Sequence, residues 1–286
     1  SQTFQTATKQ LLVHNNIKTM TGFQGGKIVR RAEVSANDTT AKPPQKEMGI
    51  RQLLDAKTGI CTYLLWDKDT EDGLLLNPVD TERARDLMVT TSMNVVFAVN
   101  THGLDRNHHI SVATRWWKQQ RPNLKVVLTK GTASSEDVDA DLLLEKDDIL
   151  LEDGDELHFG NRYITALSTA SPLNPGKMSF LLDDQKAVLT ASPLLSTRAN
   201  GRIDTLALEY LYLWALPDDT IVFPGYCHEE EQAGDDAETP RRSTVGQEKK
   251  NNPLLSMKDE LDKNDNKEAM PIFLRTRAKE RWGVFG

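Results

Sequence analysis

Short apolar runs separated by turns constrain the fold of this chain more than any other feature. The runs at 60–67 and 72–79 flank the charged turn KDTED and are typical of two paired strands. The runs at 94–100 and 125–130 are rich in valine and apolar on both faces, which predicts strands buried in the middle of a sheet. A sheet core is therefore expected to begin near residue 48.

Helical patterns alternate with these strands. A helix is predicted over 80–93 with Asp80 as its N-cap, and another over 111–122, where Pro122 ends it. Of the adjacent Trp116 and Trp117, at least one is expected in the core, and the other is a candidate interface anchor. The later part predicts a turn, strand and turn over 149–169, a hairpin over 178–195, a helix and a strand over 205–226, and a helix over 252–265. This order predicts an α/β protein in which helices flank two mixed sheets.

The length and charge of the chain limit its domain organisation and its partners. It has 286 residues, 38% of them hydrophobic, and a net charge of −7, which disfavours binding to nucleic acid. We expect an N-terminal extension over 1–47 that is disordered or ordered by a partner, and one domain over 48–270. An acidic insertion within the domain, 229–242, and a C-terminal tail, 271–286, complete the division.

The cysteines and the hydropathy pattern favour an intracellular protein. Cys61 and Cys227 are too few for a disulfide framework or a thiolate metal site, and both are expected to be reduced thiols. Cys61 lies inside an apolar run and is expected in the core. No apolar run approaches the roughly 20 residues that a transmembrane helix needs, so no transmembrane segment is predicted.

The stretch NVVFAVNTHGLDRNHHISVA, residues 94–113, begins as a strand and continues as a loop with three histidines and an aspartate. Such a loop is typical of a metal site. The alternative is a polar loop over a closed pocket, in which His102 is only hydrogen-bonded. A nucleophilic pair of Cys227 and His228 is disfavoured, because neighbours in a strand point to opposite faces.

Eight short motifs resemble, in order, those of the metallo-β-lactamase superfamily and, more narrowly, of the mitochondrial persulfide (sulfur) dioxygenases, relatives of glyoxalase II. The strand and helix GLLLNPVDTERARDL is similar to the family's AVLIDPV segment, and VVFAVNTH to the strand that enters its NTHxHADH loop. SPLNPGKMSFLLDDQKAVLTASPLL resembles PGHTPGxxxFxLxDxxxxFTGDxLL, and IVFPGY resembles xxYPAHDY. The resemblance covers residues 48 to about 256 and implies an αββα metallo-β-lactamase-like sandwich.

The resemblance also implies a ligand set, which this sequence departs from. The family's dioxygenases hold one iron with two histidines and an aspartate. Here His102 occupies the first position, but the second is Leu173 and the third is Ser192. Of the further ligands of hydrolase relatives, only one histidine has a candidate match, His109, and another is replaced by Tyr226.

The residues that surround the ligand positions also differ from those of the family. The aspartate that the resemblance places behind the metal loops is Asn77, and the glycine before the metal-binding aspartate is Ala191. Leucine offers no lone pair and serine no charge, so the sequence predicts that no metal or other cofactor is bound and that catalysis is lost.

These departures lead to a functional prediction: a pseudoenzyme kept as a structural or accessory subunit of a large mitochondrial assembly, such as a respiratory complex or a ribosome. Its partners would be other protein subunits, contacted through the extension, the insertion and the tail. Two alternatives stay open. One is a metal-dependent thioester hydrolase or sulfur dioxygenase with a rebuilt site, and the other is a thiol-binding module.

Overall fold

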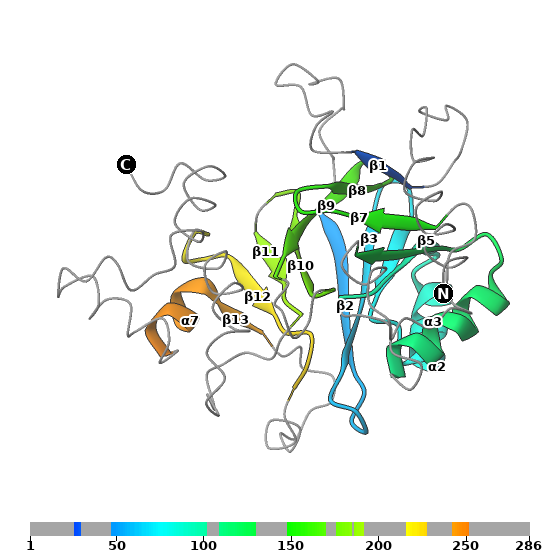
Figure 1. The fold of residues 1–286 in the computed structure, drawn as a ribbon, viewed down its shortest axis with the longest axis horizontal. Coiled ribbons are helices and arrows are strands. Elements are labelled where there is room, and N and C mark those ends of the chain that lie inside the picture. Colours follow the sequence, from blue (N-terminus) through cyan, green and yellow to red (C-terminus); the bar gives the residue numbers. More distant parts are fainter. Residues whose placement is uncertain are drawn as a thin grey trace, which may run out of the picture.

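Two β-sheets packed face to face form the centre of the protein (Figure 1). The structure is a computed structural model. It describes residues 26–29, 47–101, 109–129, 148–169, 176–184, 186–191, 216–227 and 242–251.

One sheet has six strands and a mixed order. Its strands, in spatial order, are β2 (Met48–Leu54), β3 (Cys61–Asp67), β4 (Asp72–Leu76), β5 (Asn94–Val99), β6 (Lys125–Thr129) and β7 (Ile149–Leu151). β3 pairs antiparallel with both β2 and β4, whereas β4, β5, β6 and β7 run parallel to one another. The carboxyl ends of β4, β5, β6 and β7 therefore lie along one edge of this sheet, which we call the site edge.

The other sheet has seven strands. In spatial order they are β1 (Lys27–Val29), β8 (Glu156–Phe159), β9 (Arg162–Ser168), β10 (Met178–Leu182), β11 (Ala187–Leu189), β12 (Ile221–Phe223) and β13 (Ser243–Thr244). Only β11 and β12 are parallel to each other. β1 lies within the predicted extension, and it pairs with β8 of the protein's own sheet.

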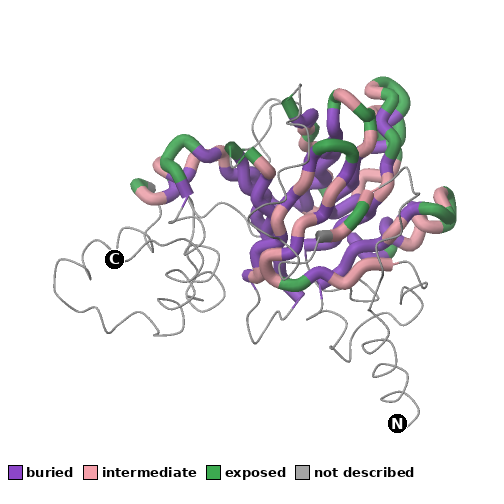
Figure 2. Tube along the Cα trace, turned by 90° about the horizontal axis from the view of Figure 1, so that it is seen from above, coloured by how far each residue is buried: buried purple, intermediate pink, exposed green. Residues whose placement is uncertain are grey.

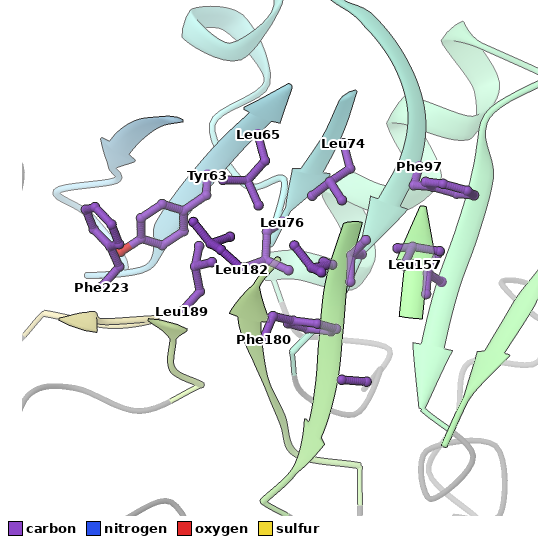
Figure 3. Packing of buried hydrophobic residues seen from close by; sticks show 14 of the residues in the cluster. Tyr63, Leu65, Leu74, Leu76, Phe97, Leu157, Phe180, Leu182, Leu189 and Phe223 are labelled. Atoms are coloured by element: carbon purple, nitrogen blue, oxygen red, sulfur yellow. The ribbon is translucent and has the colours of Figure 1, made fainter. Parts of the chain in front are cut away.

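The core between the sheets follows from the alternation of side chains along each strand. Figure 3 shows Tyr63, Leu65, Leu74, Leu76 and Phe97 of the six-stranded sheet facing the apolar side chains of the other sheet. From the seven-stranded sheet come Leu157, Phe180, Leu182, Leu189 and Phe223. Nearly all of these side chains are fully buried, as the purple interior of Figure 2 shows. Burial of this apolar surface is the main force that holds the two sheets together.

The alternate residues of the six-stranded sheet meet two helices, α2 (Thr81–Thr90) and α3 (His109–Gln120) (Figure 1). Leu64, Leu75 and Ala98 pack there against Met88 and Trp117. β3 and β4 are covered on both faces, and this explains why their sequences are continuous apolar runs. Asp80 caps α2 as predicted, since its side chain accepts a hydrogen bond from the Arg83 N–H at 3.1 Å.

The predicted architecture of two mixed sheets with helices outside is confirmed. Trp117 lies in the core as expected, and Trp116 is half-buried beside it. A short helix that the sequence analysis missed, α7 (Val245–Asn251), follows β13. In the described part of the chain, no helix is long and apolar enough to span a membrane.

Several predicted elements fall outside the described residues. They are the helix at the start of 205–226, the helix over 252–265, the tail 271–286 and nearly all of the acidic insertion 229–242. The domain limits and the partner-binding roles of these segments therefore stay predictions.

Asp67 joins the two sheets at the edge opposite the site edge. Its buried carboxylate accepts hydrogen bonds from the Asp69 N–H at 2.9 Å, from Thr70 Oγ1 at 3.1 Å and from the Asn161 N–H at 2.7 Å. Gly160 makes this approach possible, because a Cβ there would lie 2.5 Å from Asp67 Oδ2. Burial alone raises the pKa of Asp67, but the hydrogen bonds outweigh it and leave the pKa below its ordinary value.

Removing the Asp67 carboxylate should make the protein less stable in a pH-dependent way. A lowered folded-state pKa stabilises the fold above the unfolded pKa of about 3.9, and that stability is lost as the pH falls through the folded pKa. We expect Asp67→Asn to lower the free energy of unfolding by about 1–3 kcal/mol at pH 7. The deficit should shrink below about pH 4, as measured by urea denaturation.

The control is Asp86→Asn, on the exposed face of α2. It should leave the stability at pH 7 almost unchanged. A deficit for Asp67→Asn that stays constant down to pH 3 would contradict a stabilising role for the ionised carboxylate.

Candidate active site at the carboxyl ends of the strands

Three strand ends meet at residues 177–179, at the start of β10. The Met178 N–H donates to the carbonyl of Thr101, beyond β5, at 2.9 Å, and the Thr169 N–H, beyond β9, donates to the carbonyl of Lys177 at 3.1 Å. The Ala191 N–H, beyond β11, donates to Ser179 Oγ at 3.3 Å. These three ends lead into the chain segments that hold His102, Leu173 and Ser192. The fold thus brings together the described residues from which the three segments with the predicted ligand positions start.

Asn77 fixes the chain where it leaves β5. It follows β4, is fully buried and has a left-handed backbone (φ 48°), which asparagine tolerates better than most residues. Its Oδ1 accepts hydrogen bonds from the N–H and the hydroxyl of Thr101, both at 3.0 Å. Asn77 therefore positions Thr101 and, through it, the start of the segment that contains His102.

The Nδ2 group of Asn77 is a buried donor for which the described residues supply no acceptor. The orientation of the Asn77 side-chain amide is fixed, because the atom that accepts from the Thr101 N–H must be the oxygen.

The side-chain amide of Asn100 can be satisfied by a rotation. The single hydroxyl proton of Thr114 has the Ile110 carbonyl as a partner at 2.8 Å, so rotating the Asn100 amide would let its Nδ2 donate to Thr114 Oγ1. Among the described asparagines at this edge, Asn77 therefore keeps an N–H group, on Nδ2, that can donate to a ligand or to a neighbouring segment.

Uncharged polar side chains gather along the site edge. Each one follows or ends a strand or lies at the start of β10, and each is at most 4% exposed: Asn77, Asn100, Thr101, Thr129, Thr169, Ser179 and Thr190. We call this set the polar rim. Like Asn77 Nδ2, the hydroxyl of Thr169 has no hydrogen-bond partner among the described residues. Amide and hydroxyl groups bind and orient polar ligands, and without a carboxylate the rim offers no negatively charged ligand to a metal ion.

The segment 224–227, which follows β12, packs against the end of β11 at the site edge. A Cβ on Gly225 would lie 2.6 Å from the carbonyl oxygen of Thr190 and 3.1 Å from the carbonyl carbon of Ala191, so only glycine allows this approach. Tyr63 Oη donates to the carbonyl of Pro224 at 2.5 Å. Burial, helped by the nearby Cys61, raises the pKa of Tyr63 well above its ordinary value, so the phenol keeps its proton.

The structure describes two of the five predicted site residues. His109 is the first residue of α3 and is exposed, whereas Tyr226 is half-buried next to Gly225. His102, Leu173 and Ser192 lie outside the described residues. Within the described ranges, no three His, Cys, Asp or Glu side chains are grouped as metal ligands would be.

Sequence analysis missed most of the polar rim, because a single threonine or asparagine after a strand has no distinctive pattern. The signal that was present is positional: a polar residue directly after a buried apolar run, as in Asn77 and Asn100. The contact between Cys61 and Cys227 was also missed, since 166 residues separate them.

The hydrogen bonds of Asn77 predict different outcomes for two substitutions. Asn77→Ala removes both acceptor contacts, leaves the buried Thr101 N–H unpaired and puts alanine in a left-handed backbone. We expect it to lower the free energy of unfolding by about 2–4 kcal/mol. Asn77→Asp keeps the acceptor and tolerates the backbone, so its loss should be smaller. Urea denaturation of both variants provides the comparison, and equal losses would contradict the positioning role.

Solved structures share this architecture. A metallo-β-lactamase from Staphylococcus aureus matches with a TM-score of 0.55 and 17% identity, over 74% of this chain and 64% of that one. The ETHE1 protein of Myxococcus xanthus matches with a TM-score of 0.51 and 22% identity, over 73% of this chain and 85% of that one. The fold is the metallo-β-lactamase fold.

Curated sequences narrow the relationship. The mitochondrial persulfide dioxygenase ETHE1 of Bos taurus is 26% identical over 250 residues, which are 82% of this chain and 89% of that protein. The human mitochondrial protein of the same name is 26% identical over 218 residues, 73% of this chain and 76% of its own. No family model matches the chain. The chain therefore has the metallo-β-lactamase fold, and its sequence is similar to persulfide dioxygenases along most of its length.

The prediction of a pseudoenzyme that serves as an accessory subunit is wrong. The curated relatives that match along most of the chain are dioxygenases, so the similarity supports an enzyme and offers nothing for a scaffold role. The prediction assumed that each ligand must keep its place in the sequence, and it judged the site from the replacements at those places, Leu173, Ser192 and Tyr226, and from the changes at Asn77 and Ala191. A metal site needs donor atoms at the right positions in space, and different residues can supply them.

Proposed function

We propose that the protein is a sulfur dioxygenase that oxidises a persulfide, with a site that differs from that of its relatives. The observation that carries the proposal is the convergence of the ends of β5, β9 and β11 on residues 177–179. This arrangement supports an active site at the site edge, while the similarity over 82% of the chain supports the reaction. Because the curated relatives are named as mitochondrial, we also propose a mitochondrial location.

The ligand set implied by the resemblance does not fit this chain. A leucine at position 173 and a serine at position 192 cannot replace a histidine and an aspartate as iron ligands. In addition, Asn77 offers an N–H donor where an aspartate would offer a second acceptor to orient a ligand histidine. We therefore assign no step of the reaction to iron at those positions. The rebuilt site would use His102, which directly follows the anchored Thr101.

The described residues have their own part in this proposal. Asn77 Nδ2 and Thr169 Oγ1 are buried donors that would bind polar atoms of a substrate and orient it. Their burial keeps water away, which strengthens each hydrogen bond made there. Tyr63 would hold the segment 224–227 through Pro224 and so define one side of the site.

Oxygen consumption by the purified chain tests the proposal. The chain is produced in iron-supplemented medium, analysed for bound metal and supplied with glutathione persulfide. A persulfide dioxygenase consumes one O2 and one water for each sulfite formed, and each turnover releases the thiol and two protons. We expect oxygen uptake by the wild type and at least a 100-fold loss of kcat/KM in His102→Ala, comparable to the removal of a metal ligand or of its support.

The matched control is His158→Ala. His158 lies on β8, whose carboxyl end is at the opposite edge, and it contacts Glu156 and stacks on Tyr163. This variant should retain wild-type activity. A wild-type chain that neither binds a metal nor consumes oxygen with the persulfide would overturn the proposed function.

A further inference from the structure

Two cysteines that are far apart in the sequence meet at the site edge. Cys61 begins β3 of the six-stranded sheet, and Cys227 follows β12 of the seven-stranded sheet. Their sulfur atoms are 3.5 Å apart, and no disulfide joins them. Both side chains are at most 1% exposed and belong to the core between the sheets.

The backbone around the cysteines brings the two side chains together. Ile60 and Tyr226 form an isolated antiparallel bridge, with hydrogen bonds from the Cys61 N–H to the Gly225 carbonyl at 3.0 Å and from the Cys227 N–H to the Gly59 carbonyl at 2.7 Å. In this register, each cysteine faces a glycine on the other segment. Neither glycine has a side chain to separate the thiols, so Cys61 and Cys227 meet diagonally across the bridge.

The pair is coupled to the candidate active site. Gly225, two residues before Cys227, lies against the carbonyl groups of Thr190 and Ala191 with no room for a side chain. The Thr190 N–H also donates to the carbonyl of Phe223 at 2.8 Å. A movement of the segment 224–227 must therefore displace the end of β11, the strand that leads to Ser192.

We propose that Cys61 and Cys227 are a site of reversible oxidation, at which a peroxide converts the two thiols to a disulfide that links the sheets. The sulfur of one thiolate attacks the peroxide, breaks its O–O bond and becomes a sulfenic acid as water leaves. The second thiol attacks that sulfur, the S–S bond forms and the hydroxyl leaves as a second water. The thiols lose two electrons, which the peroxide gains, and an external dithiol reverses the reaction by thiol–disulfide exchange.

Geometry and burial set the expected behaviour of this site. An S–S bond is about 2.05 Å long, so the sulfurs must approach by about 1.5 Å from their present separation of 3.5 Å. The glycines beside them make this movement sterically possible. Because both sulfurs are buried, a peroxide reaches them only through local opening of the segment 224–227, and we expect oxidation over minutes to hours.

Mass spectrometry of the full chain tests the proposal. The protein is treated with excess hydrogen peroxide, unfolded in the presence of an alkylating reagent, and digested without a reductant. We expect a mass lower by two hydrogen atoms, no alkylated cysteine, and one linked peptide pair that contains Cys61 and Cys227. A dithiol reductant should restore both thiols. Two alkylated cysteines after treatment, or sulfinic acids and links between chains in place of the internal pair, would overturn the proposal.

Thermal unfolding provides the second measurement. Closing a long loop restricts the unfolded chain, so the oxidised wild type should melt about 5–10 °C above the reduced form. The matched control is Cys227→Ser, whose melting temperature should not rise on oxidation because the chain then has no second cysteine with which Cys61 could form a disulfide. If this variant does not fold, the peptide mapping of the wild type decides by itself. A rise of the same size in Cys227→Ser, or none in the wild type, would count against the internal disulfide.

Discussion

The packing of the two sheets on one another is the interaction on which the rest of the structure depends. It buries the inner faces of β3, β4 and β5 against β8, β10 and β11, and it also buries the polar groups at the ends of these strands. A buried backbone group without a partner costs about 1–3 kcal/mol, so each strand end needs an acceptor or a donor. Residues 177–179 supply partners to three of the ends at once. The convergence that supports an active site is therefore also a requirement of packing.

Local patterns in the sequence predicted most of the described strands and helices, because these elements are decided by neighbouring residues, although β1 and α7 were missed. The runs that became β3 and β4 are apolar on both faces, and Asp80 marks the start of α2. Contacts between distant segments had no such signal. The sequence shows Cys61 in a strand and Cys227 after another strand, but only the folded chain shows that Ile60 pairs with Tyr226 and brings the sulfurs to 3.5 Å.

The candidate site was harder to predict, because the fold fixes the position of a supporting residue such as Asn77 but does not fix which residues bind a metal. Asn77 is tied to the fold by its left-handed backbone and its bonds to Thr101, so its position could be matched from the motif alone. A ligand is tied only to the ion, and another donor that reaches the same place can replace it. This difference explains why the motif order gave the fold correctly, while the replacements at 173 and 192 led to a wrong conclusion about catalysis.

β3 links these observations, because it crosses the protein from one edge to the other. At one end the Asp67 carboxylate joins the sheets through uncharged donors, and at the other Cys61 meets Cys227 beside the polar rim. The two junctions differ in kind: the first depends on pH, and the second on the oxidation state of two sulfurs. Because Gly225 contacts Thr190 and Ala191 directly, a change at the cysteines has a short path to the end of β11, whereas a change at Asp67 must act through the core. A redox change should therefore affect the site more strongly than an acidification strong enough to protonate Asp67 at the opposite edge.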